Sequence, residues 1–90
     1  MTNWPAWWSW EIEPSEHLRK RMLDRHFNET DLRLMLEEAT LLSLSLEPGR
    51  WIAITTLAGR PWKIVLEPDA SKCIVVVVTA FAVRKKGPRV

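Results

Sequence analysis

The sequence predicts an α+β fold, in which a hairpin of two short helices packs on one antiparallel sheet in the order β-α-α-β-β-β-β. Three observations lead to this prediction. Apolar residues recur every three or four positions within segments 16–26 and 28–39, which is the helical period. Near the N-terminus and again after residue 40, apolar residues alternate with polar ones or run continuously, as in strands. Short turns separate the later strands, and strands joined by short turns pair antiparallel.

The first strand is predicted over residues 7–13, where alternation places three apolar side chains on one side of the chain, namely Trp8, Trp10 and Ile12. Pro14 ends this strand. Ser15 is a natural N-cap for a helix over residues 16–26, with Leu18 on its buried stripe.

Asn28 is expected to cap a second helix, which has acidic residues in its first turn and ends near Ala39. Its buried face combines residues at helical spacing, which are Leu32, Met35, Leu36 and Ala39. The short break between the two helices predicts that they form a hairpin.

Four more strands are predicted over segments 40–46, 50–57, 62–67 and 73–83. Trp51 and Trp62 are expected to face one another across the hairpin that joins the second and third of these strands. Cys73, at the start of an apolar run, is expected to be a small core residue. The two helices should cover one face of this sheet.

Composition restricts the class of protein. With 90 residues, 47% of them hydrophobic, the chain is predicted to form a single domain over residues 1–83, with a Trp-rich N-terminal segment. Segment 84–90 is a basic tail. The sequence has a single cysteine and no zinc-ligand spacing. We therefore expect no internal disulfide, no bound metal and no other cofactor. The apolar run 73–83 is about half the length of a membrane-spanning helix, and the N-terminus lacks the basic residues of a secretory signal, so we expect a cytoplasmic protein that does not enter the membrane.

Two segments resemble a known family. Residues 15–25 read Ser-Glu-His-Leu-Arg-Lys-Arg-Met-Leu-Asp-Arg, and residues 77–81 read Val-Val-Thr-Ala-Phe. They are similar to the His-x-x-x-Arg-Met-x-x-Arg helix and the closing Val-Val-Thr-Ala-Tyr of a family of small bacterial domains of largely unknown function. That family is grouped with the RelE-like and BrnT-like toxins of toxin–antitoxin pairs. The resemblance covers residues 10–83 and departs from the family at His26, usually Gly, and at Phe81, usually Tyr.

The resemblance implies a RelE-like fold and a metal-independent endoribonuclease, a hydrolase that binds RNA, in some cases on the ribosome, and has an antitoxin protein as its partner. Cleavage of RNA without a metal needs a base for the 2′-hydroxyl proton and cations for the developing charge. His17, Arg21 and Arg25, spaced four residues apart on the first helix, would supply them. Thr79 would hydrogen-bond His17 and support its orientation. The expected RNA-binding residues are Arg60, Lys63, Arg84, Lys85 and Lys86.

Two alternatives stay open at this point. The row formed by His17, Arg21 and Arg25 is equally consistent with a structural role, in which it satisfies strand carbonyls or pairs with Glu11 and Glu13. His26, in turn, fits either a residue that interacts with the last carbonyls and the dipole of the first helix or a second catalytic histidine.

The tryptophans of the N-terminal segment also allow two interpretations. Too many lie within seven positions for one side of one strand, so Trp4, Trp7 and Trp8 are candidates for binding a partner. That partner would be an antitoxin or a second copy of the chain, which would make the protein a homo-oligomer. On this interpretation the chain is a non-catalytic protein-binding module of the same fold. On the other, Trp8 and Trp10 belong to the core while Trp4 and Trp7 fold over an exposed edge.

Overall fold

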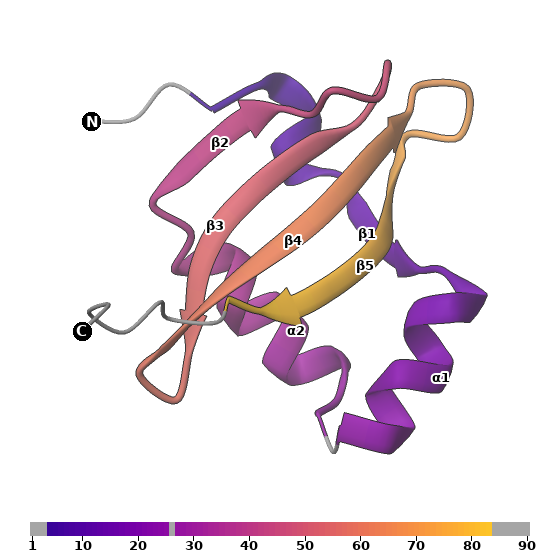
Figure 1. Ribbon diagram of the computed structural model, residues 1–90. Helices are drawn as coiled ribbons and strands as arrows, with labels where there is room; N and C mark the ends of the chain where they lie inside the picture. The colour runs from indigo at the N-terminus through magenta and orange to yellow at the C-terminus, as the bar shows by residue number, and fades with distance from the viewer. Residues whose placement is uncertain (1–3, 26, 84–90) are drawn as a thin grey trace.

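The computed structural model describes residues 4–25 and 27–83. It has an α+β fold in which two helices and a short 3-10 helix lie on one face of a five-stranded sheet (Figure 1). Within these residues, no helix is long and apolar enough to cross a membrane. The elements in chain order are η1 (Ala6–Ser9), β1 (Glu11–Pro14), α1 (Glu16–Arg25), α2 (Glu29–Glu37), β2 (Leu41–Leu44), β3 (Trp51–Leu57), β4 (Arg60–Asp69) and β5 (Ile74–Ala82).

The sheet is mixed, with the strand order β1-β5-β4-β3-β2. The pairs β2–β3, β3–β4 and β4–β5 are antiparallel, as predicted from their short connections. The prediction of an entirely antiparallel sheet is wrong for β1, which pairs parallel with β5. No short turn joins these two strands, because they are far apart in the sequence, and their relative direction is therefore not restricted by a hairpin.

The N-terminal segment also differs from the prediction of a strand over residues 7–13. Residues Ala6–Ser9 form a 3-10 turn, in which the Trp8 N–H donates to the Pro5 carbonyl at 3.0 Å, and the strand begins only at Glu11. A strand would send neighbouring tryptophans to opposite faces. The turn instead lets three half-buried tryptophans pack against the core, Trp7, Trp8 and Trp10.

Both predicted helix caps are confirmed. The Ser15 hydroxyl oxygen accepts a hydrogen bond from the Leu18 N–H at 3.1 Å. The Asn28 side chain accepts from the Asp31 N–H at 2.9 Å while the Asp31 carboxylate accepts from the Asn28 N–H, which makes a capping box. Helix α2 ends at Glu37, before the expected end near Ala39. The prediction for His26 falls outside the described residues.

Two predictions about individual residues of the sheet are wrong. Trp51 lies opposite Leu66 and Trp62 lies opposite Thr55, so the two tryptophans do not face one another. Their separation follows from the long β3–β4 hairpin, whose turn lies at Ala58-Gly59. Each packs against another aromatic ring at a centroid distance of 5.4 Å, Trp51 on Trp7 and Trp62 on Phe27.

Cys73 is exposed rather than part of the core. Its φ of 53° shows that it belongs to the turn before β5, which starts at Ile74. In that turn the Asp69 carboxylate accepts hydrogen bonds from Ser71. The turn therefore includes Cys73, which was predicted to begin the last strand.

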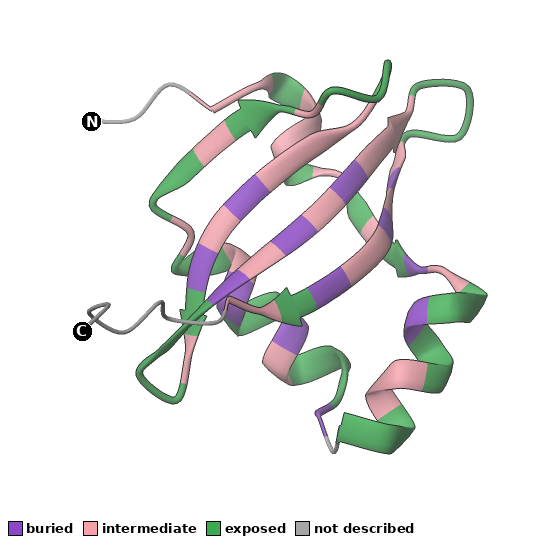
Figure 2. Ribbon diagram, in the orientation of Figure 1, coloured by how far each residue is buried: buried purple, intermediate pink, exposed green. Residues whose placement is uncertain are grey.

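The core lies between the helices and the inner face of the sheet. Along β3 and β4, buried residues alternate with half-buried ones, as Figure 2 shows. The largest fully buried side chains are Leu18, Leu32, Met35, Thr55, Ile64, Leu66 and Val77. Thr55 is polar, and its hydroxyl donates to the carbonyl of Met35 near the end of α2. This bond satisfies a carbonyl of the last helical turn, where intrahelical donors run out.

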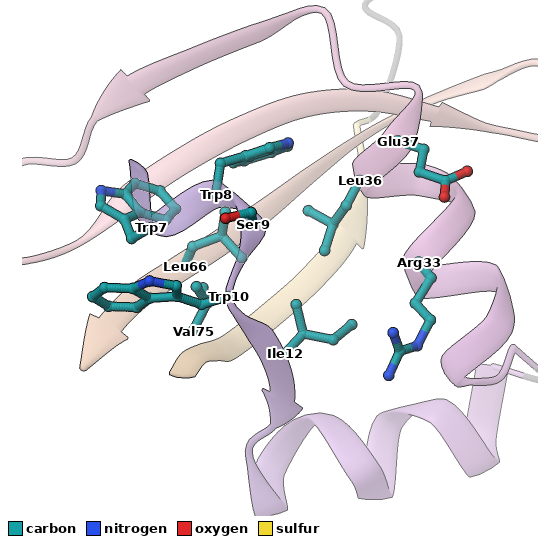
Figure 3. A pocket seen from close by; sticks show the side chains of 10 residues that line it. All are labelled: Trp7, Trp8, Ser9, Trp10, Ile12, Arg33, Leu36, Glu37, Leu66 and Val75. Atoms are coloured by element: carbon teal, nitrogen blue, oxygen red, sulfur yellow. The ribbon is translucent and has the colours of Figure 1, made fainter. Parts of the chain in front are cut away.

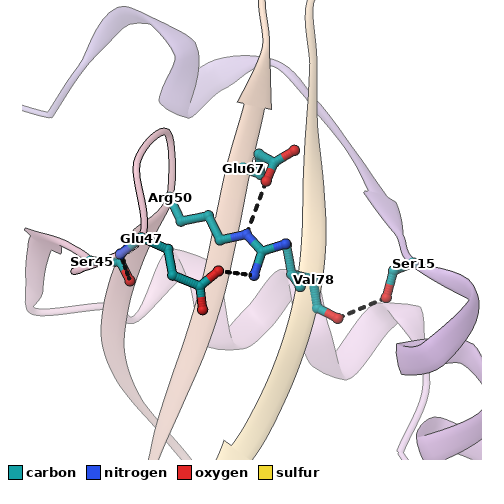
Figure 4. Close-up of polar contacts among 6 residues, drawn as sticks. All are labelled: Ser15, Ser45, Glu47, Arg50, Glu67 and Val78. Carbon is teal, nitrogen blue, oxygen red and sulfur yellow. Dashed lines mark hydrogen bonds and ion pairs between the residues drawn. The ribbon is translucent and has the colours of Figure 1, made fainter.

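The junction between β1 and α1 is held on β5 by one serine. The Ser15 N–H donates to the Val77 carbonyl at 3.0 Å, and the Ser15 hydroxyl donates to the Val78 carbonyl at 2.7 Å (Figure 4). An irregularity in the β4–β5 register occurs nearby, between Val65 and Leu66. These bonds determine where α1 leaves the sheet.

Candidate functional site

A pocket of about 280 Å³ opens between η1 and α2 on the inner side of the sheet (Figure 3). Its floor is the core itself, because Leu66 and Val75 line it and are 1% and 2% exposed. The lining residues are Trp7, Trp8, Ser9, Trp10, Ile12, Arg33, Leu36, Glu37, Leu66 and Val75. We call this site the Trp-lined pocket.

The tryptophans around this pocket support one another. Trp7 packs against Trp8 at 5.9 Å between ring centroids and against Trp51 at 5.4 Å. Trp4 stacks on Trp8 at 4.7 Å. Stacked and tilted pairs at these distances are favourable arrangements for aromatic rings. The wall of the pocket on the η1 side is therefore built from mutually packed rings.

Two charged residues of α2 lie at the rim of the Trp-lined pocket, Arg33 and Glu37, and both are exposed (Figure 3). Arg33 makes a distant ion pair of 4.0 Å with Glu29, one turn earlier on α2. An exposed pair of this length contributes little to stability. The Arg33 guanidinium can therefore turn toward a bound molecule at small cost.

The structure places the three residues predicted to be catalytic along α1, and none of them lines the Trp-lined pocket. His17 and Arg25 are exposed, and Arg21 is half-buried. Helical spacing puts them on one side of α1. Among the described residues, none of the three takes part in an ion pair or a side-chain hydrogen bond, so the alternative in which they pair with Glu11 and Glu13 is not observed.

The predicted support of His17 by Thr79 is not formed. Thr79 lies opposite Val65, a position that alternates with the buried Ile64 and Leu66, so it belongs to the face of the sheet away from the helices. No hydrogen bond joins His17 to Thr79 in the part of the chain that the structure describes.

The predicted RNA-binding residues are not gathered on one surface. Arg60 is exposed at the start of β4, and Lys63 is half-buried on the same strand. Since they are three positions apart on a strand, their side chains leave opposite faces of the sheet. The remaining predicted RNA-binding residues, Arg84, Lys85 and Lys86, fall outside the described residues.

Two charged groups away from the pocket have shifted pKa values. The Glu67 carboxylate accepts a hydrogen bond from Arg50 at 2.9 Å, which raises the pKa of Arg50, and Glu47 adds to this effect (Figure 4). The hydrogen bond from the Ser71 hydroxyl lowers the pKa of Asp69. Both pairs stabilise turns at the ends of strands. Within residues 4–25 and 27–83, no group of three His, Cys, Asp or Glu side chains could hold a metal ion.

Comparison with known proteins found no relative. No protein-family model matches the chain, and neither the curated proteins nor the solved structures contain a match to it. The RelE-like resemblance of residues 10–83 therefore stays a prediction.

Sequence reasoning found part of the Trp-lined pocket. It singled out Trp7 and Trp8 as candidates for binding a partner, and both line the pocket. It missed Arg33 and Glu37, whose spacing of four residues indicates only an exposed helix face. Trp10, which was predicted to lie in a strand, instead follows the 3-10 turn and lines the pocket.

Proposed function

We propose that this domain is a protein-binding module, whose Trp-lined pocket takes an apolar side chain from a partner protein. One observation carries the proposal: an open cavity of about 280 Å³ with tryptophan walls leads directly to core residues Leu66 and Val75. Because the pocket is open, its apolar lining is in contact with water, and an apolar side chain from a partner would remove that lining from water.

The size of the pocket suits a single large side chain. Cavities for small ligands and cofactors span roughly 300–1,000 Å³, and this pocket lies just below that range. A single large apolar or aromatic side chain, inserted as an anchor, is the occupant that matches its size.

The surroundings of the pocket are also those of a protein interface. Tryptophan is enriched among the residues that dominate binding energy, as is arginine. Here an apolar centre is bordered by Arg33 and Glu37, which gives the polar rim typical of an interface. Because the rim carries both signs, a partner segment with an acidic group beside its anchor would pair with Arg33. We place this interaction in the cytoplasm.

The experiment selects peptides from a random display library on the wild-type domain and compares their binding to two variants. Ser9→Trp fills the mouth of the pocket from an exposed position without removing a core contact. Thr30→Trp is the matched control, because Thr30 is equally exposed on α2 but does not line the pocket.

We expect the selected peptides to share a large apolar residue and to bind Ser9→Trp at least about tenfold more weakly, which corresponds to about 1.4 kcal/mol. Their affinity for Thr30→Trp should equal that for wild type. Peptides that bind both variants as tightly as wild type would place the binding surface elsewhere and refute the proposal.

A second candidate function is the metal-independent endoribonuclease of a RelE-like toxin, with an antitoxin as the occupant of the Trp-lined pocket. The observation in its favour is that His17, Arg21 and Arg25 share one side of α1 and make no ion pair within the described residues. An imidazole with a guanidinium group one turn along the helix and a second one two turns along is a suitable base for attack on a phosphodiester.

Incubation of total RNA with the protein and EDTA, with and without ribosomes, tests this candidate. His17→Ala removes the base, whereas Lys20→Ala changes an exposed residue elsewhere on α1 and is the matched control. Discrete cleavage by wild type and Lys20→Ala but not by His17→Ala supports the ribonuclease. Intact RNA in every reaction, or equal cleavage by all three proteins, contradicts it.

A further inference from the structure

The face of the sheet opposite the helices has no described element across it (Figure 1). We call it the outer face. Its residues follow from the pairing register, since they alternate with the buried residues of the inner face. The apolar residues of the outer face are Ile52, Ile54, Val65, Ile74, Val76 and Phe81, and the outward side chains of Lys63, Glu67 and Thr79 lie among them.

Such a face differs from the usual antiparallel sheet with one side in water, where polar residues alternate with apolar ones. Phe81, for example, is 38% exposed, and Leu41 of the neighbouring edge strand is 54% exposed. An apolar surface bordered by polar and charged residues in this way is typical of an interaction site.

The charges of the outer face show which partner fits it. On β4, the central strand of the sheet, the outward residues run Lys63, Val65, Glu67. Lys63 and Glu67 are equally far from Val65, about 6.6 Å on each side at the rise of a strand. Two stacked sheets can be related by a two-fold axis that lies midway between them, next to Val65 and perpendicular to β4. Rotation about this axis reverses the direction of the strand. It places Lys63 of one copy opposite Glu67 of the other, twice. The Glu67 carboxylate already accepts from Arg50 of its own chain through Oε1, but its side chain is 47% exposed, so the second oxygen can accept from Lys63 of the other copy.

We infer that the outer face binds a second copy of this chain, and that the two sheets stack face to face around Val65. Stacked sheets lie about 10 Å apart, a distance that lysine and glutamate side chains span together. An isologous dimer of this type is the most common form of assembly among soluble proteins. The inference is independent of the Trp-lined pocket, which lies on the inner side of the sheet.

The area is sufficient for a weak specific dimer. Five strands about 4.8 Å apart, with lengths of four to ten residues, present a face of roughly 500 Å². Two such faces bury about 1,000 Å² in total, which is near the lower limit for biological interfaces. We therefore expect an association that depends on protein concentration.

Sedimentation velocity of the full chain over a range of concentrations tests the inference. Wild type should approach twice the monomer mass of 10.5 kDa as its concentration rises. Lys63→Glu and Glu67→Lys each place like charges opposite one another, so each single variant should raise the dissociation constant by at least about tenfold. The double variant restores opposite charges and should return to the wild-type value. Within one chain the two residues are too far apart on their strand to compensate for each other, so this rescue reports the interface alone.

Two further variants keep the test decisive. Val65→Lys brings two like charges together at the two-fold axis and should give a monomer even where Glu67→Lys, which loses the ion pair with Arg50, unfolds. Leu34→Lys changes a leucine that is 49% exposed on α2 and should leave the mass unchanged. A wild-type monomer at all attainable concentrations overturns the inference. So does a dimer that persists in Val65→Lys, or a charge-swapped double variant that is folded by circular dichroism but is not restored.

Discussion

Ser15 shows how much of the fold one residue determines. Its hydroxyl accepts from the Leu18 N–H at the start of α1 and donates to the Val78 carbonyl of β5, and its own N–H donates to Val77. The end of β1, the start of α1 and the middle of β5 therefore meet at one side chain. The sequence predicts the capping half of this role, but the bond to Val78 depends on a strand 63 residues away.

Replacement of Ser15 by alanine should lower the free energy of unfolding by about 1–2 kcal/mol, because the cap is lost and a β5 carbonyl loses its partner. Urea denaturation followed by circular dichroism measures this change. Thr30→Ala, at an exposed position of α2, is the control and should stay within about 0.5 kcal/mol of wild type. Equal stability of the two variants would mean that Ser15 does not hold this junction.

Asp69 makes the free energy of unfolding depend on pH in the acidic range. The Ser71 hydroxyl holds the pKa of Asp69 below its ordinary value of 3.8, so the ionised carboxylate stabilises the folded state. This contribution is complete above the unfolded pKa and is lost as the pH falls through the lower, folded pKa. The advantage of wild type over Asp69→Asn in urea denaturation should therefore be present near neutral pH and shrink below pH 3.8. A difference that does not change with pH would contradict the role of the carboxylate charge.

At the scale of elements, the β3–β4 hairpin is joined by two residues in the left-handed region. Ala58 has a φ of 52° and Gly59 a φ of 79°, with Leu57 and Arg60 paired beside them. This is the geometry of a type I′ turn, which favours Asn-Gly. Glycine adopts the conformation freely, whereas alanine does so at a cost.

Asparagine at position 58 should therefore stabilise the domain by about 0.5–1 kcal/mol, and valine should destabilise it by about 1 kcal/mol or more. Thermal or urea denaturation of Ala58→Asn and Ala58→Val beside wild type measures both. The reverse order of stability, or no difference among the three proteins, would show that residue 58 does not keep this turn conformation.

The elements that the sequence predicts well are those determined by local signals. The helix starts follow from Ser15 and Asn28, whose side chains cap the following turn. The hairpins of β2 to β5 follow from short turns. The parallel pairing of β1 was not predictable in this way, because it depends on contacts across the whole chain. The 3-10 turn of η1 was missed because alternation of Trp8, Trp10 and Ile12 matches a strand equally well.

At the scale of the whole molecule, the sheet separates the candidate sites. The Trp-lined pocket opens on the inner side between η1 and α2, and the row of His17, Arg21 and Arg25 lies on α1. The outer face is opposite both, so a dimer formed there leaves the pocket free for a partner. The aromatic part of the pocket was predictable from the density of tryptophans, whereas Arg33 became part of the site only through the packing of α2.

A nuclear magnetic resonance titration of the isotope-labelled protein with the tightest selected peptide tests whether the Trp-lined pocket is the protein-binding site. Signals of η1 and of the α2 residues at the pocket rim should shift, including the indole N–H signals of Trp7, Trp8 and Trp10. Signals of α1 around Arg21 and of the outer face around Val65 should stay in place. Shifts that centre on α1 or on the outer face, with unchanged tryptophan signals, would contradict the assignment of the Trp-lined pocket as the protein-binding site.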